Sequence, residues 1–232
     1  PAADMLAIES TGDEDDEASR TLLVVHKDGR FRQETSGIRP SIEGYDGQVC
    51  WQRDATGLTK SLALSDREYL LLLTQLRSGC WLRLADPDSL AIADQGATDA
   101  SVTFEVRSGR AVSQVTVQKD TGNPTRCEYL GTLGQVVCEL SDYREHSGWV
   151  VPMSVRFTDS LAPSTMSVQH VRPIAQDDPV DFSKPASVRG DVTFASGAAP
   201  ELELTRARTG HVLVEVVLDD QQPHTFVFDT GA

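Results

Sequence analysis

The sequence predicts a mainly β, α+β fold: a large curled antiparallel sheet with one buried helix, followed by a small, partial all-β domain. Three observations predict it. Strand-like segments follow one another with short turns and no crossover helices, which favours antiparallel pairing of consecutive strands. A single leucine-rich helix stands among them. Residues 175–190 lack apolar periodicity, so they are interpreted as a linker between domains spanning residues 21–174 and 191–232.

Residues 1–20 are an acidic segment for which the sequence predicts no element. Its acidic run, residues 13–17, is interpreted as a solvated loop, because calcium-binding loops interleave their acids with glycine. Two hairpins are predicted next, at Asp28-Gly29 and at Asp46-Gly47. The Asp-Gly pair is a strong hairpin signal because both turn positions need a positive φ.

The helix is predicted to begin at the capping box Ser65–Glu68 and to stop at Gly79. Its leucines cover more than one face, which indicates a helix buried on several sides within a curved sheet. After it, a long meander is predicted with strands at residues 102–107, 110–119, 125–130, 135–144, 149–158 and 165–171.

Four cysteines match no zinc or redox spacing. A two-residue turn at Thr132-Leu133 would place Cys127 and Cys138 opposite each other on adjacent strands, where a disulfide is feasible. Cys50 and Cys80, each followed by Trp, are candidates for a second bridge. The alternative is four buried thiols that pack as small hydrophobic groups. Disulfides would indicate an oxidising compartment.

The first domain resembles the periplasmic lipoprotein-carrier type of half-barrel, on its hairpins, its single helix and three motifs: residues 120–126, residues 142–144 and residues 148–152. The resemblance implies a curved sheet, closed by helices, that shelters acyl chains in the periplasm or outside the cell. Leu70, Leu72, Leu73 and Leu76 are then candidates for contact with an apolar ligand. Core packing without any ligand explains the same leucines.

The last residues combine an apolar strand, Phe226–Phe228, with the tripeptide Asp229-Thr230-Gly231. Another Asp-Thr-Gly begins at Asp120, but its neighbours are polar and turn chemistry explains them. Apolar neighbours would raise the pKa of Asp229, as in a catalytic carboxyl group. An ordinary turn is the alternative.

With the strands predicted before it, this stretch resembles the start of a retropepsin-like aspartic peptidase domain. The resemblance implies that Asp229 is a catalytic carboxylate, that Thr230 hydrogen-bonds to the partner loop and that Gly231 permits its close approach. The second catalytic Asp would come from a homodimer partner or from chain beyond residue 232. The family's flap also follows the Asp strand, so we expect no peptidase activity from these 232 residues alone.

Composition excludes some partners. The net charge of −14 argues against a nucleic acid or an anionic membrane surface. Histidines are scattered and no nucleotide-binding loop occurs, so neither a metal nor a cofactor is predicted. Two hypotheses follow. The first is an extracytoplasmic aspartic peptidase, acting on a peptide or protein, with an N-terminal ligand-binding or regulatory half-barrel. The alternative is a non-enzymatic module that binds a lipid or lipoprotein.

Overall fold

The computed structural model describes the chain in two compact units, Pro1–Gly190 and Asp191–Ala232. The described residues are 3–14, 17–37, 40–55, 57–79, 90–108, 111–131, 134–158, 163–175, 177–187, 205–206, 212–217 and 223–228.

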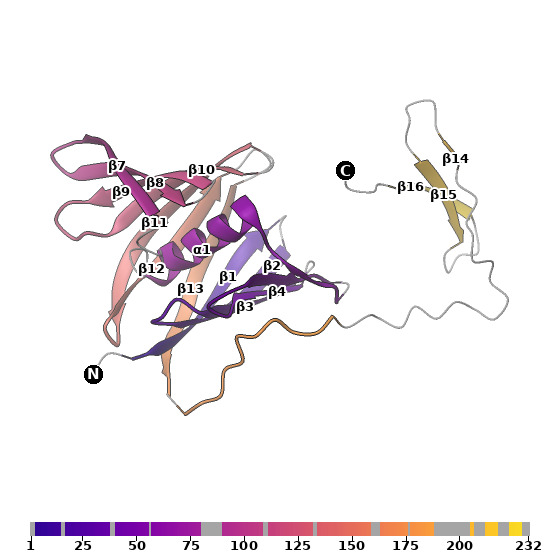
Figure 1. Ribbon diagram of the computed structural model, residues 1–232, viewed down its shortest axis with the longest axis horizontal. Helices are drawn as coiled ribbons and strands as arrows, with labels where there is room; N and C mark the ends of the chain where they lie inside the picture. The colour runs from indigo at the N-terminus through magenta and orange to yellow at the C-terminus, as the bar shows by residue number, and fades with distance from the viewer. Residues whose placement is uncertain are drawn as a thin grey trace. The chain divides into compact units, whose positions relative to one another are not determined.

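The strands described in the first unit form one antiparallel sheet of thirteen, curled but not closed into a barrel (Figure 1). Its first six strands are β1 (Met5–Glu14), β2 (Glu17–His26), β3 (Phe31–Ser36), β4 (Ser41–Tyr45), β5 (Cys50–Arg53) and β6 (Thr59–Ser61). After helix α1 (Leu64–Ser78) come β7 (Leu90–Ala97), β8 (Ser101–Ser108), β9 (Ala111–Gln118), β10 (Pro124–Gly131), β11 (Gly134–His146), β12 (Trp149–Thr158) and β13 (Pro163–Ile174). The predicted fold class, a large curled antiparallel sheet with one helix, is confirmed.

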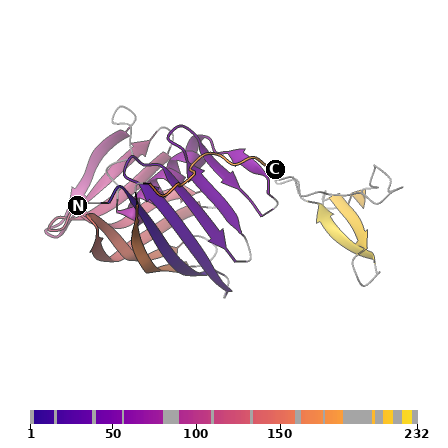
Figure 2. The same ribbon diagram turned by 90° about the horizontal axis from the view of Figure 1, so that it is seen from below.

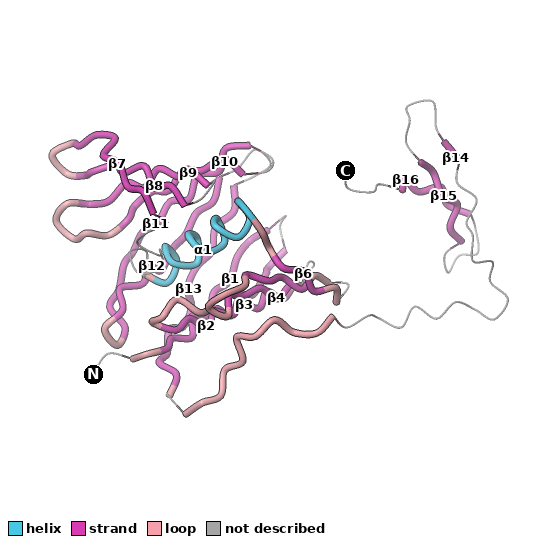
Figure 3. The backbone as a smooth tube through the Cα atoms, viewed as in Figure 1, coloured by secondary structure: helices cyan, strands magenta, loops and turns pink. Residues whose placement is uncertain are grey.

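The order of strands explains the position of the helix. The chain starts near the middle of the sheet at β1 and steps strand by strand to the edge at β6. It re-enters the sheet at the opposite edge, β7, and steps back to β13, which pairs with β1. Helix α1 follows the edge strand β6 and precedes the other edge strand, β7. It lies between the two arms of the curled sheet, which are the first arm, β1 to β6, and the second arm, β7 to β13 (Figure 1). It is the only helix in the described part of the chain (Figure 3).

Local signals placed most turns correctly, and the two Asp-Gly hairpins are present as β2–β3 and β4–β5. Two strands of the sheet were missed by the prediction. Residues 5–14, predicted only as part of an acidic segment, form β1 at the centre of the sheet, paired with both β2 and β13. Strand β7 was not predicted either. The alternating apolar residues of β1 are few, and its pairing with β13 depends on residues far away in sequence.

Helix α1 differs from its prediction at the start. It begins at Leu64 with Ala63 at the N-cap position, where no side chain caps the helix, so Ser65 lies inside the first turn rather than at the cap. It ends as predicted at Gly79, which has a left-handed φ of 76° and donates its N–H to the carbonyl oxygens of Gln75 and Leu76. Gly accepts this conformation without steric cost.

The leucines of α1 face two apolar clusters on the concave side of the sheet. Leu70 and Leu71 pack against a cluster on one arm and the central strands, composed of Leu6, Ile8, Leu23, Val25, Phe31, Trp149 and Val151. Leu76 belongs to a second cluster, against which Leu72 and Leu73 pack, together with Val106, Val115, Val117, Cys127, Cys138, Leu140 and Val155. The helix is therefore buried on more than one side, as its leucine pattern predicted.

Residues 177–187, within the predicted linker at residues 175–190, form a strap across the face of the first arm that points away from α1 (Figure 2). Phe182 is 5% exposed and packs with Met5, Ala7 and Ile174. Its carbonyl oxygen accepts a hydrogen bond of 3.0 Å from the Trp51 indole N–H. Further along, the Ser187 hydroxyl oxygen accepts the Thr59 N–H at 3.0 Å. Two aromatic residues thus fix a segment that contains no helix or strand.

The second unit contains a three-stranded antiparallel sheet among its described residues, in the order β14 (Thr205–Arg206), β15 (Val212–Val217) and β16 (Pro223–Phe228). Strands β15 and β16 form a hairpin in which Val212 pairs with Phe228 and Val217 pairs with Pro223. The apolar strand predicted at Phe226–Phe228 lies within β16 and ends at the same residue.

Candidate functional site

The four leucines predicted to contact a ligand fill the space between α1 and the sheet. Leu76 has no exposed surface, and Leu70, Leu72 and Leu73 are partly buried against the two apolar clusters. They line neither of the cavities described below. In this state the leucines act as core residues, so an acyl chain could reach Leu76 only if α1 moved away from the sheet.

The interface under α1 also contains polar atoms without hydrogen-bond partners among the described residues. Thr74 and Gln75 on the helix are 2% and 4% exposed, yet Thr74 Oγ1 and Gln75 Nε2 make no hydrogen bond there. Ser113 Oγ on β9 is also buried and has no hydrogen-bond partner among the described residues. A buried polar group left without a partner costs about 1–3 kcal/mol. The closed position of the helix is therefore less favourable than its leucines alone suggest.

A cavity of about 500 Å³ opens on the concave side of the sheet, and we call it the inner cavity. Phe157 of β12 and Met166 of β13 supply its apolar wall, whereas Gln33 of β3 and Gln52 of β5 supply polar groups. Arg77, in the last turn of α1, completes it. Pockets of roughly 300–1,000 Å³ with a few converging polar groups are typical of small-molecule sites. This cavity has that size, and its lining combines the apolar wall with a majority of polar side chains.

Arg77 and Asp54 are the charged residues that line this cavity, and Glu43 is hydrogen-bonded to Gln33 of the same lining. Arg77 and Glu43 are partly buried, whereas Asp54 is exposed. Burial raises the pKa of the Glu43 carboxyl group, and the positive charge of Arg77 opposes that rise. Burial likewise lowers the pKa of Arg77, while Glu43 opposes the fall. Glu43 Oε1 accepts a hydrogen bond of 2.8 Å from Gln33 Nε2, and Arg77 Nη2 donates to Met166 Sδ at 3.2 Å. A thioether sulfur is only a weak acceptor.

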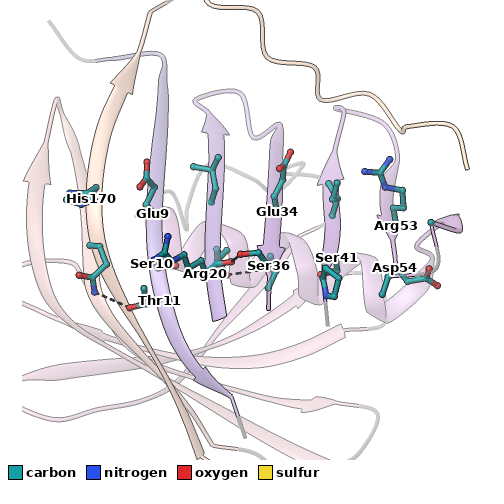
Figure 4. A pocket seen from close by; sticks show the side chains of 18 residues that line it. Glu9, Ser10, Thr11, Arg20, Glu34, Ser36, Ser41, Arg53, Asp54 and His170 are labelled. Carbon is teal, nitrogen blue, oxygen red and sulfur yellow. Dashed lines mark hydrogen bonds between the residues drawn. The ribbon is translucent and has the colours of Figure 1, made fainter. Parts of the chain in front are cut away.

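A larger hollow, about 930 Å³, lies on the opposite face of the first arm, where its side chains point away from α1 (Figure 4). We call it the outer trough. Glu9, Leu22, Glu34 and Ile42 follow one another across β1 to β4 because each faces the next in the strand register. Most of its lining is polar or charged.

The predicted cysteine pair is brought together. Cys127 and Cys138 face each other across β10 and β11, as the two-residue turn predicted, and both are fully buried as free thiols. Cys50 is also a buried free thiol, opposite Tyr45. Cys80, its predicted partner, lies outside the described residues. The facing pair therefore has the position that a disulfide requires, and its formation remains a prediction.

The predicted catalytic residues Asp229, Thr230 and Gly231 lie outside the described residues. The earlier Asp-Thr-Gly, by contrast, is described and forms the turn between β9 and β10. There the Thr121 hydroxyl oxygen accepts the Asn123 N–H at 3.2 Å, and Gly122 N–H donates to the Gln118 carbonyl at 2.9 Å. These contacts are those of an ordinary turn.

The sequence did not predict that Arg77, Gln33 and Glu43 come together at the inner cavity. Gln33 and Glu43 lie on paired strands and Arg77 lies on the helix, so the group exists only once the first arm curls around α1. One signal was available: an arginine on a leucine-rich helix that is predicted to be buried on several sides must place its charge near a partner or a cavity. Among the described residues, no group of three or more His, Cys, Asp or Glu side chains could hold a metal ion, and no helix is long and apolar enough to cross a membrane.

A curled antiparallel sheet with a helix across its concave face is the half-barrel architecture that the sequence motifs resembled. Comparison with solved structures shows the same fold. A LolA superfamily protein from Nitrosomonas europaea matches with a TM-score of 0.51 at 13% identity, over 76% of this chain and 88% of that chain. A DUF1329 family protein from Desulfovibrio piger matches with a TM-score of 0.48 at 14% identity, over 77% of this chain and 88% of that chain.

A domain assigned to an outer membrane lipoprotein-sorting protein from Vibrio parahaemolyticus matches with a TM-score of 0.49 at 10% identity, over 78% of this chain and 88% of that chain. No protein-family model matches the sequence, and no curated protein matches it significantly. At 13% identity, the likeness to the LolA superfamily protein shows the fold alone.

Proposed function

We propose that this chain is a non-enzymatic binding module that shelters the acyl chain of a lipid or lipoprotein between α1 and the curled sheet. The observation that carries the proposal is the helix itself. It spans the concave face over two apolar clusters and has the inner cavity beside its last turn. The half-barrel fold shared with the LolA superfamily protein supports the same reading.

The physical basis is an exchange of similar contacts. If α1 moves outward, Leu70, Leu72, Leu73 and Leu76 lose contact with the sheet, and an acyl chain can replace them at the same apolar surface. Burying apolar surface contributes roughly 25 cal/mol per Å², whichever apolar group provides it. Displacement also gives Thr74 Oγ1 and Gln75 Nε2 access to water, which removes the cost of leaving them without partners. Outward movement of α1 is therefore opposed mainly by the loss of apolar contacts with the sheet, and a bound acyl chain restores those contacts.

The proposal includes a location and a class of partner. The half-barrel fold shared with the LolA superfamily protein supports a location in the periplasm or outside the cell. A net charge of −14 disfavours binding to an anionic membrane surface and is compatible with capture of single lipid molecules.

Titration with a fluorescent long-chain fatty acid tests the proposal. We expect saturable binding with a dissociation constant in the micromolar range or below, and displacement by the unlabelled fatty acid. Val155→Thr, on the sheet surface that Leu73 and Leu76 cover, should weaken binding, whereas Leu58→Gln, at a leucine that is 55% exposed, should not. Absence of saturable binding by a folded protein would contradict the proposal.

A second candidate function rests on the C-terminal unit. In the sequence, Asp229 follows directly after the apolar strand β16, as the peptidase resemblance implies. We propose that Asp229 is one carboxylate of an aspartic peptidase pair, completed by a homodimer partner or by chain beyond residue 232. The gene sequence after Ala232 tests this: an apolar flap hairpin should follow within roughly one small domain. Unrelated sequence there removes this candidate.

A further inference from the structure

Arg77 is a cation without a strong acceptor in the part of the chain that the structure describes. Its hydrogen bond there goes to the Met166 sulfur, and no carboxylate oxygen of the described residues lies within 4.0 Å of its guanidinium nitrogens. Among the residues that line the inner cavity, it is the single cation. A guanidinium group presents five donors in a rigid fork that matches a phosphate or a carboxylate. Most of the hydrogen-bond donors of the Arg77 guanidinium group have no acceptor among the described residues.

Gln33 contributes the complementary feature. Its side chain is 8% exposed, and its Nε2 donates to Glu43 Oε1 at 2.8 Å, which fixes the orientation of the amide. Its Oε1 accepts no hydrogen bond from the described residues, although it is buried at the lining of the inner cavity. Buried polar atoms in native structures are nearly always paired, so an orphaned acceptor beside a cavity indicates a missing donor.

The Arg77 guanidinium group and Gln33 Oε1 lie beside the apolar wall formed by Phe157 and Met166. A molecule that satisfies all three groups has an apolar chain, an anionic group and a nearby hydroxyl or amide donor. We infer that the inner cavity binds the head group of a single-chain anionic amphiphile, with the anion on Arg77 and a hydroxyl group on Gln33 Oε1. This inference rests on the proposed function, because it assigns the head group of a ligand whose chain lies under α1.

The specificity follows from the charges. A neutral head group leaves the guanidinium of Arg77 with its weak sulfur contact, whereas a phosphate or carboxylate group forms charge-assisted hydrogen bonds with it. Glu43, whose negative charge acts on Arg77, opposes an incoming anion. The cavity therefore discriminates by head-group charge, and Glu43 together with Asp54, a carboxylate of the lining, limits how tightly the anion is held.

Competition binding with two lipids of the same chain tests the inference. The probes are 1-oleoyl-lysophosphatidic acid, which has a phosphate and a free hydroxyl group, and 1-oleoylglycerol, which is neutral. Both compete with a fluorescent fatty acid below their aggregation concentrations. We expect the phosphate lipid to bind at least tenfold more tightly. Arg77→Gln should weaken it about tenfold to a hundredfold and leave 1-oleoylglycerol unchanged.

Matched variants give the controls. Arg144→Gln removes an arginine that pairs with Asp142 at the sheet surface and should change neither affinity. Glu43→Gln should strengthen binding of the phosphate lipid alone. Unchanged affinity of Arg77→Gln for 1-oleoylglycerol also shows that this variant is folded, and circular dichroism provides a second check.

The possible results separate the inference from the proposed function. If both lipids bind equally, or Arg77→Gln loses no affinity for the phosphate lipid, the inference is wrong and the proposed function stands. If neither lipid binds to the unmodified protein, the proposed function itself fails. Inorganic phosphate that displaces the phosphate lipid at equal concentration would show an ion site rather than a lipid head-group site, which also overturns the inference.

Discussion

At the scale of single residues, Gly79 joins two requirements that no other amino acid meets. Its φ of 76° closes α1 in the left-handed conformation, and a Cβ atom placed there would lie 1.8 Å from the Val150 carbonyl oxygen. The glycine thus ends the helix and also permits its close approach to β12.

Gly79→Ala tests this double role. The left-handed conformation alone costs alanine roughly 1–2 kcal/mol, and the clash with Val150 adds to it. Gly122→Ala is the matched control, because Gly122 has a φ of 72° but open space around its Cβ position. We expect Gly79→Ala to lose at least about 2 kcal/mol more than Gly122→Ala in urea denaturation, the increment typical of overpacking. Equal losses would show that the helix end can shift away from β12.

Glu43 should make stability depend on pH. Burial raises its pKa in the folded state, so folding favours the protonated form. Its contribution to stability is then fully present below the unfolded-state pKa and is lost as the pH rises through the folded-state pKa. Glu43→Gln mimics the protonated form and should therefore raise the free energy of unfolding at pH 7.

Urea denaturation at several pH values provides the measurement. The advantage of Glu43→Gln over the unmodified protein should shrink as the pH falls through the folded-state pKa of Glu43, and it should be smallest below 4.5, the ordinary pKa of this side chain. The control is Glu34→Gln, at a side chain 47% exposed that pairs with Arg32. Glu34→Gln should change stability by less than about 0.5 kcal/mol at each of these pH values. A Glu43→Gln variant less stable at pH 7 would mean that its charge is needed beside Arg77.

At the scale of elements, the strap shows how a segment without regular structure is held. Phe182 packs in the apolar cluster on the outer face, and the Arg30 guanidinium lies 5.1 Å from the centre of its ring. Beside it, Trp51 covers Gly44, where a Cβ atom would lie 2.6 Å from the indole ring.

Phe182→Ala should therefore destabilise the first unit by about 3 kcal/mol, the lower end of the range for a buried phenylalanine. Phe182→Leu, which keeps an apolar side chain, should lose less than half of that. Urea denaturation measures both variants. A loss below about 0.5 kcal/mol for Phe182→Ala would mean that the strap contributes nothing to the stability of the sheet.

The β10–β11 hairpin leads to a chemical prediction. Burial raises the pKa of Cys138 to about 12 and raises that of Cys127 still further, so the thiolate forms are scarce at neutral pH. We expect both thiols to resist alkylation by iodoacetamide in the folded protein and to react after unfolding. Refolding with oxidised glutathione should join Cys127 to Cys138 and release two molecules of reduced glutathione. Peptide mapping by mass spectrometry identifies the bridge, and a Cys50 linkage in its place would contradict it.

Elements that depend on neighbours in sequence could be predicted, and elements that depend on distant partners could not. The Asp-Gly turns, the end of α1 and the facing of Cys127 and Cys138 all follow from local chemistry. Strand β1 does not, because its place at the centre comes from pairing with β13, at the far end of the unit. The same limit applies to the candidate site. The leucines of α1 were visible in sequence, but the approach of Arg77 to Gln33 exists only in the folded arm.

At the scale of the whole molecule, the topology makes α1 a separable part of the core. Each strand of the half-barrel is held by hydrogen bonds to its neighbours, whereas α1 contacts the sheet through side chains. Movement of the helix therefore breaks no strand pairing. The closed and open positions form an equilibrium, and a ligand that binds the open form shifts it by its difference in affinity for the two forms.

Gln75→Leu tests that equilibrium. The substitution keeps a similar volume and removes a buried donor that has no partner among the described residues. It should stabilise the closed form by about 1 kcal/mol, seen as a higher free energy of unfolding in urea. Because a fatty acid must then displace a more stable helix, its affinity should fall roughly fivefold. Gln114→Leu, at an exposed position on β9, should change neither quantity. Higher stability with unchanged affinity would show that the acyl chain enters the half-barrel without displacing α1.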